Sequence, residues 1–306
     1  MDITGRIQIF VSVVKHQSFA EAARSLGITT SAVSKQVQTL EDSLGVKLLH
    51  RTTRRLNLTE EGALYFERVS RIVEDLEEAE RLVQNTKAHP TGVLKVNAPI
   101  TFATYHLAKP LADFAKACPD IEMQIDLSDR YVDLIEEGYD VAIRIGILQD
   151  SSLIARKLAP CHIPLYASPE YLKKHGTPKT PADLKDHTFI GYTMQQKKDD
   201  EWQYKAPDGK IGKVPITTRI NSNNGEMMLA AACAGLGIIK LPSFMIANEV
   251  KSGRLKPVLP GYEIHPERNI YAVFPENRYL SNKVRTFVNF LSDTFKGTPE
   301  WDKVKA

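Results

Sequence analysis

The most informative stretch of the chain is residues 18–41, Ser18-Phe-Ala-Glu-Ala-Ala-Arg-Ser-Leu-Gly-Ile-Thr-Thr-Ser-Ala-Val-Ser-Lys-Gln-Val-Gln-Thr-Leu-Glu41. Its sequence predicts two short helices joined by a tight turn. Ser18 is a favourable N-cap, and Glu21 three residues later completes a capping box, so the first helix begins there. Gly27 ends this helix. Four apolar residues at helical spacing give it one buried face, namely Phe19, Ala22, Ala23 and Leu26.

The second helix has an apolar inner face and a polar outer face. Thr29 or Thr30 caps it, and Val33, Val37 and Leu40 point inward. The outer residues carry hydroxyl, amide and ammonium groups, which suit base edges and phosphates in a major groove. An ordinary helical hairpin is the alternative, but the cap, the turn glycine and the alanine pair together favour a DNA-binding helix-turn-helix. The DNA-binding candidates here are Thr29, Thr30, Ser31, Ser34, Lys35 and Gln38.

A two-stranded wing is predicted after Gly45. In the stretch from Val46 to Thr59, apolar ends at Val46, Leu48, Leu56 and Leu58 flank a basic centre. A solvated basic turn is the alternative. Next to a recognition helix, a role at the minor groove or its phosphates is favoured. The candidates are Arg51, Arg54 and Arg55.

Thr59 caps a long helix that carries a heptad seam. Apolar residues recur in it at intervals of four and three, which is typical of a coiled-coil contact. This helix leads to His89-Pro-Thr-Gly92, which has the composition of a hinge. Packing within the chain is possible for such a seam, but pairing with a second chain is favoured. The predicted dimer residues are Tyr65, Val69, Ile72, Leu76, Ala79 and Val83.

The net charge of +3 is unevenly distributed along the 306 residues. Residues 1–58 hold eight Lys or Arg and four Asp or Glu, a balance of +4, whereas residues 59–90 hold four and eight, a balance of −4. The basic excess therefore lies on the predicted DNA reader. The three cysteines match no metal or disulfide spacing, which favours buried thiols over a redox sensor. The sequence has no export signal and no apolar run long enough to span a bilayer, so we expect a cytoplasmic protein without membrane contact.

From Val93 the pattern changes to alternating strands and helices, which predicts parallel sheets covered on both faces. The expected first set has strands at 93–97, 122–127 and 140–145 and helices at 101–117 and 132–137. The second set has strands at 163–167, 189–192, 216–220 and 237–241 and helices at 170–174, 225–234 and 243–251. A last strand and helix follow at 269–274 and 281–295.

Residues 3–66 resemble the winged helix-turn-helix of the LysR-type transcriptional regulators. The matching elements include Ala32-Val-Ser-Lys, Leu44-Gly45, Arg51-Thr-Thr-Arg54 and Leu58-Thr-Glu-Glu-Gly62. Thr30 and Ser31 depart from the glutamine and proline that the family often has, which affects base preference rather than fold. A stretch resembling Asp150–Leu158 recurs in a large branch of the family named for CrgA.

The resemblance implies an N-terminal all-α winged domain and a C-terminal α/β domain of two lobes, similar to type 2 periplasmic binding proteins. The expected boundaries are 1–58 for the DNA-binding domain, 59–88 for the dimerising helix, 89–92 for the hinge and 93–300 for the effector domain. Its first lobe is 93–161 with 268–300, and its second is 162–267.

Loops after the strand ends are the predicted effector site, because open α/β sheets bind ligands there, near helix N-termini that favour anions. Asn223 and Glu226 have capping-box spacing. Arg144 ends a buried strand and needs a partner, either a carboxylate such as Asp129 or Glu226 or a bound acid. Plain helix caps that need no ligand are the alternative. The effector candidates are Ile100, Thr101, Phe102, Arg144, Gly146, Ser222, Asn223 and Asn224.

The prediction is a transcriptional regulator and not an enzyme, with no metal and no cofactor. The expected partners are double-stranded DNA, bound at an interrupted inverted repeat near a promoter, and a small anionic effector. The family resemblance also implies contact with RNA polymerase. It also implies a dimer through the linker helix and a tetramer made of two such dimers. Two alternatives stay open: a solute-binding or catalytic α/β protein with an incidental helical N-terminus, and a DNA-binding protein whose C-terminal domain only assembles oligomers.

Overall fold

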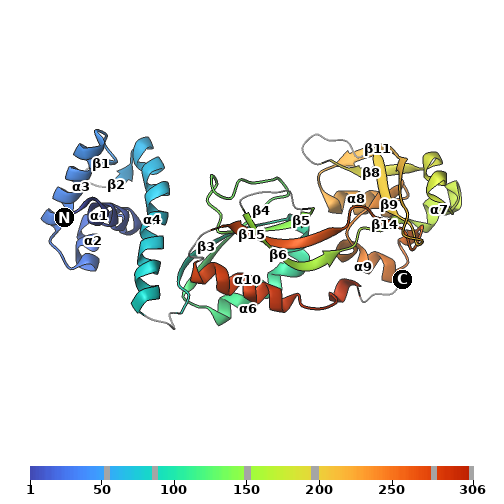
Figure 1. Cartoon of the computed structure of the whole chain (residues 1–306). Coiled ribbons are helices and arrows are strands. Elements are labelled where there is room, and N and C mark those ends of the chain that lie inside the picture. The colour runs from blue at the N-terminus through green and yellow to red at the C-terminus, as the bar shows by residue number, and fades with distance from the viewer. Residues whose placement is uncertain (52–55, 85–88, 148–152, 194–199, 277–280, 303–306) are drawn as a thin grey trace. The chain divides into compact units, whose positions relative to one another are not determined.

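The computed structural model describes residues 1–51, 56–84, 89–147, 153–193, 200–276 and 281–302 (Figure 1). It describes only the backbone of residues 51, 71, 74–75, 77–84 and 300. The chain divides into two compact units, Met1–Ala88 and His89–Ala306, each with its own core. We describe each unit by itself.

The first unit begins with three helices, α1 (Ile3–His16), α2 (Phe19–Leu26) and α3 (Thr30–Leu44). The predicted caps are confirmed: the Ser18 hydroxyl accepts from the Glu21 N–H at 3.3 Å, and the Thr29 hydroxyl accepts from the Ala32 N–H at 3.2 Å. Gly27 ends α2 with a φ of 66°, where an L side chain would be strained.

Two details of α2 differ from the prediction. The Glu21 carboxylate pairs with Arg24 one turn further along the helix, so it does not act as the second half of a capping box. Leu26 is 39% exposed, because the helix ends there and its side chain lies past the edge of the core. Ala22 and Ala23 are buried as predicted, and their small side chains let α2 pack closely in the core.

The wing consists of β1 (Leu49–Arg51) and β2 (Leu56–Leu58), paired antiparallel. Leu48 and Leu49 are buried in the core of the unit, whereas Val46 is exposed and lies outside the hairpin that it was predicted to open. Arg54 and Arg55 lie outside the described residues.

Helix α4 (Glu60–Gln84) starts as predicted at Thr59, whose hydroxyl accepts from the Gly62 N–H at 2.9 Å. Its first half belongs to the core of the same chain. The ring of Tyr65 lies 5.8 Å from that of Phe10, and Val69 and Val73 are each 4% exposed. The predicted seam therefore needs a correction: Val69 faces the chain's own core and is not free for a partner.

The second unit contains a five-stranded sheet in the order β4-β3-β5-β15-β6. Strand β3 runs parallel to β4 and β5, but β15 is antiparallel to both β5 and β6, so the sheet is mixed rather than parallel. Strand β6 had not been predicted. The strands are β3 (Gly92–Ala98), β4 (Ile121–Leu127), β5 (Val141–Gly146), β6 (Leu153–Cys161) and β15 (Arg268–Pro275).

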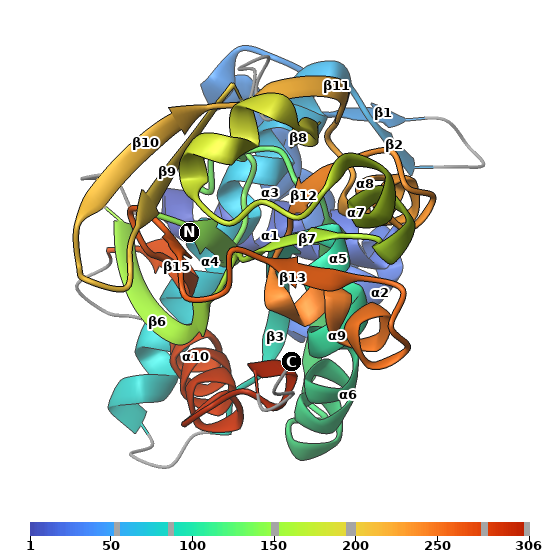
Figure 2. The same cartoon turned by 90° about the vertical axis from the view of Figure 1, so that its right-hand side faces the viewer.

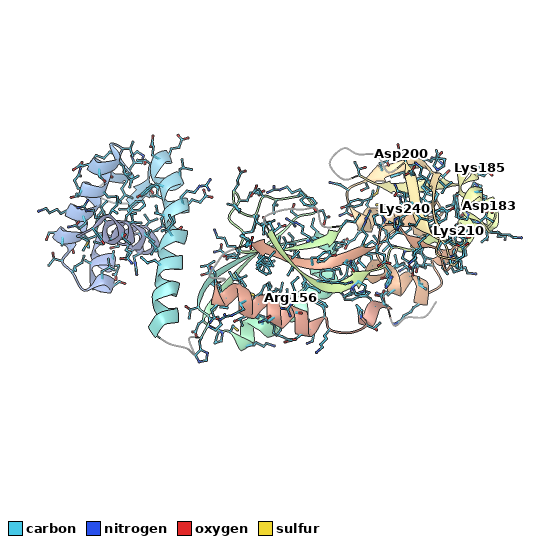
Figure 3. The ribbon with its side chains drawn as sticks, viewed as in Figure 1. Arg156, Asp183, Lys185, Asp200, Lys210 and Lys240 are labelled. Atoms are coloured by element: carbon cyan, nitrogen blue, oxygen red, sulfur yellow. The ribbon has the colours of Figure 1, made fainter. Side chains whose placement is uncertain are left out.

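Both long helices of this lobe cover one face of the sheet (Figure 1). One is continuous over α5 (Ile100–Phe102), a π-helical turn (Ala103–Leu107) and α6 (Ala108–Ala117), and the other is α10 (Asn282–Thr294). The rings of Phe114 and Phe287 join the two helices at 5.0 Å. Arg156 on β6 donates to the Ser292 hydroxyl of α10 at 3.2 Å (Figure 3).

The other face of the sheet was predicted to carry a helix at residues 132–137. This segment forms turns instead, in which the Asp133 carboxylate accepts from the N–H groups of Ile135 and Glu136, both at 2.9 Å. Val132 and Leu134 pack against Ala142 of β5 and form a small separate core.

The second lobe has a sheet in the order β11-β8-β12-β7-β13 and a smaller sheet in the order β10-β9-β14. The smaller sheet was not predicted; its two long strands lie side by side in Figure 2. The strands are β7 (Leu165–Ala167), β8 (Thr188–Tyr192), β9 (Glu201–Lys205), β10 (Ile211–Pro215), β11 (Thr217–Ser222), β12 (Ile238–Lys240), β13 (Lys256–Val258) and β14 (Glu263–Ile264). The helices are α7 (Pro169–His175), α8 (Gly225–Cys233) and α9 (Ser243–Lys251), with 3₁₀ turns at Pro181–Asp186 and Glu300–Asp302.

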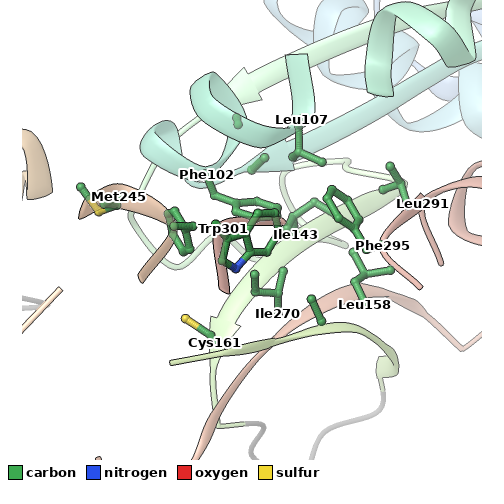
Figure 4. Close-up of a cluster of buried hydrophobic side chains, with 14 of the residues drawn as sticks. Phe102, Leu107, Ile143, Leu158, Cys161, Met245, Ile270, Leu291, Phe295 and Trp301 are labelled. Atoms are coloured by element: carbon green, nitrogen blue, oxygen red, sulfur yellow. The ribbon is translucent and has the colours of Figure 1, made fainter. Parts of the chain in front are cut away.

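One hydrophobic core extends across both lobes. Phe102, which is 0% exposed, lies at its centre, with its ring 5.3 Å from Phe244, 5.7 Å from Phe295 and 6.0 Å from Trp301 (Figure 4). Because Phe244 is on α9 of the second lobe, this cluster fixes the two lobes against each other.

Candidate DNA-binding surface and effector cleft

Helix α3 presents its predicted polar residues on the outside of the first unit. Thr30, Ser31 and Lys35 are exposed, whereas Ser34 and Gln38 are half-buried. Two of these side chains already have partners: the Ser31 hydroxyl lies 3.0 Å from that of Thr29, and the Gln38 amide donates to Asp42 at 2.7 Å. Gln38 must therefore give up a bond to a carboxylate before it can donate to a base.

Glu41, at the C-terminal end of α3, ties this helix to the wing. It is buried, and one carboxylate oxygen accepts from the N–H groups of Leu48 and Leu49 at 2.9 and 3.2 Å. The other oxygen accepts from the Lys47 ammonium at 2.9 Å. Burial alone would raise the pKa of Glu41, but these hydrogen bonds outweigh it, and the pKa lies below its ordinary value. Sequence reasoning missed this role, although a glutamate among buried helix positions was a visible signal.

The predicted wing contacts stay predictions. Arg51 is placed as the last residue of β1, and its side chain is not described; Arg54 and Arg55 lie in the undescribed tip.

In the second unit, the start of α5 is held by the loop that follows β4. The Asp129 carboxylate accepts from the Ile100 N–H at 3.2 Å, and the Ser128 N–H donates to Ala98 at 3.0 Å. Thr101 is buried beside this contact, and Ile100 is partly exposed. Phe102 belongs to the core between the lobes, where its whole side chain packs against protein.

Arg144 has an incomplete set of partners. One guanidinium nitrogen donates to the side chain of Asn97 at 2.7 Å and to the Ile143 carbonyl at 3.2 Å. The Tyr131 ring lies 5.5 Å from the centre of the guanidinium group. The other terminal nitrogen, Nη2, is buried and donates to no atom of the described residues. The predicted carboxylate partners were wrong, because the Asp129 carboxylate caps α5 and Glu226 binds Tyr105.

Burial lowers the pKa of Arg144 from its ordinary range, but an arginine side chain stays charged at neutral pH. A buried cation with a free donor favours an anionic partner. Asn97 was missed from the sequence, although it is the polar residue in an otherwise apolar end of β3 and could have been recognised.

Facing residues of the second lobe lie at the ends of β8 and β11. Asn224 is the N-cap of α8 and accepts from the Met227 N–H at 2.9 Å. This corrects the capping box predicted for Asn223, which is exposed. The Ser222 hydroxyl accepts from the Asn224 N–H at 3.0 Å, so Ser222 and Asn224 form one turn. Gly146 closes β5 in the first lobe with a φ of 152°.

Two electrostatic interactions connect these strand ends. Burial and the nearby charge of Asp129 raise the pKa of Tyr192, at the end of β8, to about 12, which keeps its hydroxyl protonated. Tyr105 of the π-helical turn is hydrogen-bonded to Glu226 at the start of α8. The two lobes therefore meet at the carboxyl ends of their parallel strands, where the predicted candidates other than Phe102 lie.

The cysteines have no disulfide in the described part of the chain. Burial raises the pKa of Cys161 to about 12 and also raises those of Cys118 and Cys233, so all three thiols are protonated at neutral pH. Among the described residues, no cluster of His, Cys, Asp and Glu has the arrangement of a metal site. Within the same residues, no helix combines the length and the apolar character needed to cross a membrane.

The chain consists of a winged helix-turn-helix followed by two α/β lobes whose strand ends face each other. This arrangement is that of a ligand-responsive DNA-binding regulator. Comparison with known proteins identifies the group. Residues 4–63 match the bacterial regulatory helix-turn-helix of the LysR family, and residues 87–296 match the LysR substrate binding domain. The protein belongs to the LysR family of transcriptional regulators.

Similar relatives extend over nearly the whole chain. The regulator CrgA of Neisseria meningitidis serogroup B is 36% identical over 285 residues, 93% of this chain and 94% of that protein. The transcriptional activator AaeR of Escherichia coli K12 is 34% identical over 295 residues, 96% and 94% of the two chains. A transcriptional repressor of Pseudomonas aeruginosa is 35% identical over 301 residues, 98% and 94%.

Solved structures show the same two-part architecture. That of CrgA is 34% identical and aligns with a TM-score of 0.60 over 97% of this chain and all of that one. Full-length AphB, a virulence activator of Vibrio cholerae, is 27% identical and aligns with a TM-score of 0.59 over 96% of this chain and all of that one.

Proposed function

We propose that this regulator responds to a small anionic effector bound between its two lobes, and that it reads an interrupted inverted repeat near a promoter. The observation that carries the effector proposal is the free Nη2 donor of the buried Arg144. The loop 128–131 links it to the start of α5, since Asp129 bonds Ile100 and the Tyr131 ring lies over the guanidinium group. An anion at either place would act on the other through this loop.

The DNA-reading part rests on the exposed face of α3. Thr30, Ser31 and Lys35 lie on it, and Ser34 and Gln38 lie at its edge. We assign base or phosphate contacts to these residues together with Thr29, and minor-groove or phosphate contacts to Arg51, Arg54 and Arg55 of the wing. A two-fold dimer reads two-fold DNA, which is why an inverted repeat is the expected operator.

Dimerisation is assigned to the outer side of α4. Leu64 and Ile72 are 62% and 59% exposed in the single chain, an unfavourable arrangement for large apolar groups unless a second helix covers them. Leu76 is half-buried, and the side chains of Ala79 and Val83 are not described. Tetramer formation and contact with RNA polymerase are part of the proposal by analogy with the family. Similar relatives include both an activator and a repressor.

The effector proposal is tested at Thr101. Thr101→Val keeps the shape of the side chain but removes its hydroxyl, so the response of DNA binding to effector should be lost while DNA affinity without effector is kept. Fluorescence anisotropy with operator DNA, with and without effector, measures both. Thr104→Val is the matched control, because the Thr104 hydroxyl donates to Ile100 within its own helix at 2.9 Å. A normal response in Thr101→Val would place the effector elsewhere.

A purely oligomerising C-terminal domain is the second candidate function. A screen of small carboxylic acids by thermal unfolding separates the two, because a ligand that binds only the folded state raises the melting temperature. A rise that disappears in Arg144→Lys supports the effector site, since lysine keeps the charge but cannot supply two separate donors.

A further inference from the structure

A concave site that contains none of the proposed effector residues lies elsewhere in the second unit. It is a groove of about 630 Å³ between the π-helical turn of the first lobe, α9 of the second lobe, and the segment Thr294–Trp301. Both lobes contribute to its walls. A molecule bound in this groove would therefore contact both lobes without entering the cleft.

The floor of the groove is aromatic. The imidazole ring of His106 lies 4.3 Å from the Trp301 ring and 5.5 Å from the Phe244 ring, and Phe295 lies 6.0 Å from Trp301. These side chains line the groove and belong at the same time to the core between the lobes, where Figure 4 shows Phe295 and Trp301 together. A flat apolar body fits such a floor, because it can stack on the rings.

The rim of the groove is cationic. Lys251 at the end of α9 and Lys296 after α10 both line it and are exposed, and neither forms an ion pair with a described residue. His106 adds no charge, because burial lowers its pKa by more than the hydrogen bond between its Nε2 atom and the Phe244 carbonyl oxygen, at 3.1 Å, raises it.

No described carboxylate lines the groove, and the adjacent Asp302 has one oxygen that is buried without a hydrogen-bond partner among the described residues. Asp302 accepts from the Ser243 hydroxyl at 2.6 Å, and Glu249 accepts from Arg254 at 2.9 Å. The two ammonium groups at the rim therefore have no neutralising group in the groove among the described side chains. One negatively charged group on a ligand would meet two cations.

The backbone supplies an independent reason to regard this place as functional. Ala103–Leu107 forms a π-helical turn within a longer helix, and this turn places Tyr105 and His106 on the wall of the groove. Such turns are rare, weaken helix geometry and are frequent at functional sites. An uninterrupted α-helix would direct one of these two side chains elsewhere.

We propose that this groove is a second ligand-binding site, specific for a small carboxylate with a flat apolar ring system. The ring lies on Trp301 and His106, and the carboxylate lies between Lys251 and Lys296. Because the ligand contacts both lobes, its binding stabilises the lobe arrangement in which both sets of contacts form. It therefore acts as a second regulatory ligand beside the effector.

The test is isothermal titration calorimetry of the full chain with 2-naphthoate and with the neutral 2-naphthalenemethanol. We expect 2-naphthoate to bind and the alcohol to bind about tenfold or more weakly, the order of one charge-assisted contact. The double variant Lys251→Gln/Lys296→Gln should lose a similar factor. Lys173→Gln/Lys174→Gln on α7 removes the same charge from an exposed helix elsewhere and should bind like the parent.

Two further variants separate the groove from the cleft. Ala247→Phe fills the groove without changing its charge and should abolish binding. Thr101 lies at the proposed effector site and not in the groove, so Thr101→Val should leave 2-naphthoate binding unchanged. The groove proposal can therefore hold even if the effector proposal fails. Absence of 2-naphthoate binding, unchanged binding in Lys251→Gln/Lys296→Gln or Ala247→Phe, or loss of binding in Thr101→Val would each overturn it.

Discussion

Glu41 shows how a single buried carboxylate can position a DNA reader. Its two oxygens hold three donors from Lys47, Leu48 and Leu49, which join the end of α3 to the start of the wing. Glu41→Ala leaves two buried N–H groups without an acceptor, so we expect a loss of about 2–4 kcal/mol in unfolding free energy. Glu41→Gln keeps one oxygen and should lose less. Chemical denaturation measures both, and equal stability of Glu41→Ala and the parent would contradict this account.

The same residue predicts a pH dependence. The pKa of Glu41 is lower in the folded than in the unfolded state, so its contribution is complete above the ordinary value of 4.5. It is lost as the pH falls below that value through the folded-state pKa. Unfolding free energies measured between pH 3 and pH 7 should therefore fall less steeply on the acid side for Glu41→Gln than for the parent. Parallel curves would mean that the carboxylate is not specifically stabilised.

At the scale of elements, α3 and α4 each have one face in the core and one face outside. On α3, Lys35 is exposed and points away from the core. Lys35→Ala should weaken DNA binding and reduce the slope of log K against log salt by about one phosphate contact per chain. The reduction should be similar for specific and unrelated DNA; an effect confined to one sequence would indicate a base contact instead. Lys15→Ala on α1 is the matched control.

On α4, adjacent residues have opposite environments. Ile72 is 59% exposed and Val73 is 4% exposed. Ile72→Glu should therefore raise the dimer dissociation constant by about two orders of magnitude while the fold is kept, since it buries a charge only in the dimer. Val73→Glu should instead unfold the first unit. Sedimentation and circular dichroism separate the outcomes, and an intact dimer in Ile72→Glu would exclude this face of α4.

For the whole molecule, the core between the lobes couples their stabilities. Phe102→Ala removes the ring that contacts Phe244, Phe295 and Trp301, and should cost about 3–5 kcal/mol. Because this ring joins the lobes, we expect calorimetry to show separate unfolding transitions where the parent shows coupled ones. Phe189→Ala, buried within the second lobe, should lower the stability of that lobe without separating the transitions.

Much of the architecture could be predicted because local signals agree with it. Caps at Ser18, Thr29 and Thr59 and the glycine turn at Gly27 place the helices of the first unit correctly. What could not be predicted depends on contacts distant in sequence. Which residues of α4 are buried and which are exposed depends on where Phe10 lies. The partner of Arg144 depends on the register of β3 against β5. Phe102 looked like a site residue for the same reason: its neighbours Phe244 and Trp301 lie more than a hundred residues away.

The position of β15 has a consequence for synthesis of the protein. In the first sheet, β15 lies between β5 and β6, yet residues 268–275 are made more than a hundred residues after β5. While the chain emerges from the ribosome, β6 therefore has no strand to pair with and β5 has only β3, whereas residues 165–258 already contain every strand of the five-stranded sheet in the second lobe. The second lobe can therefore fold first. The first lobe, although it begins earlier in the chain, can complete its sheet only after β15 near the C-terminal end has been synthesised.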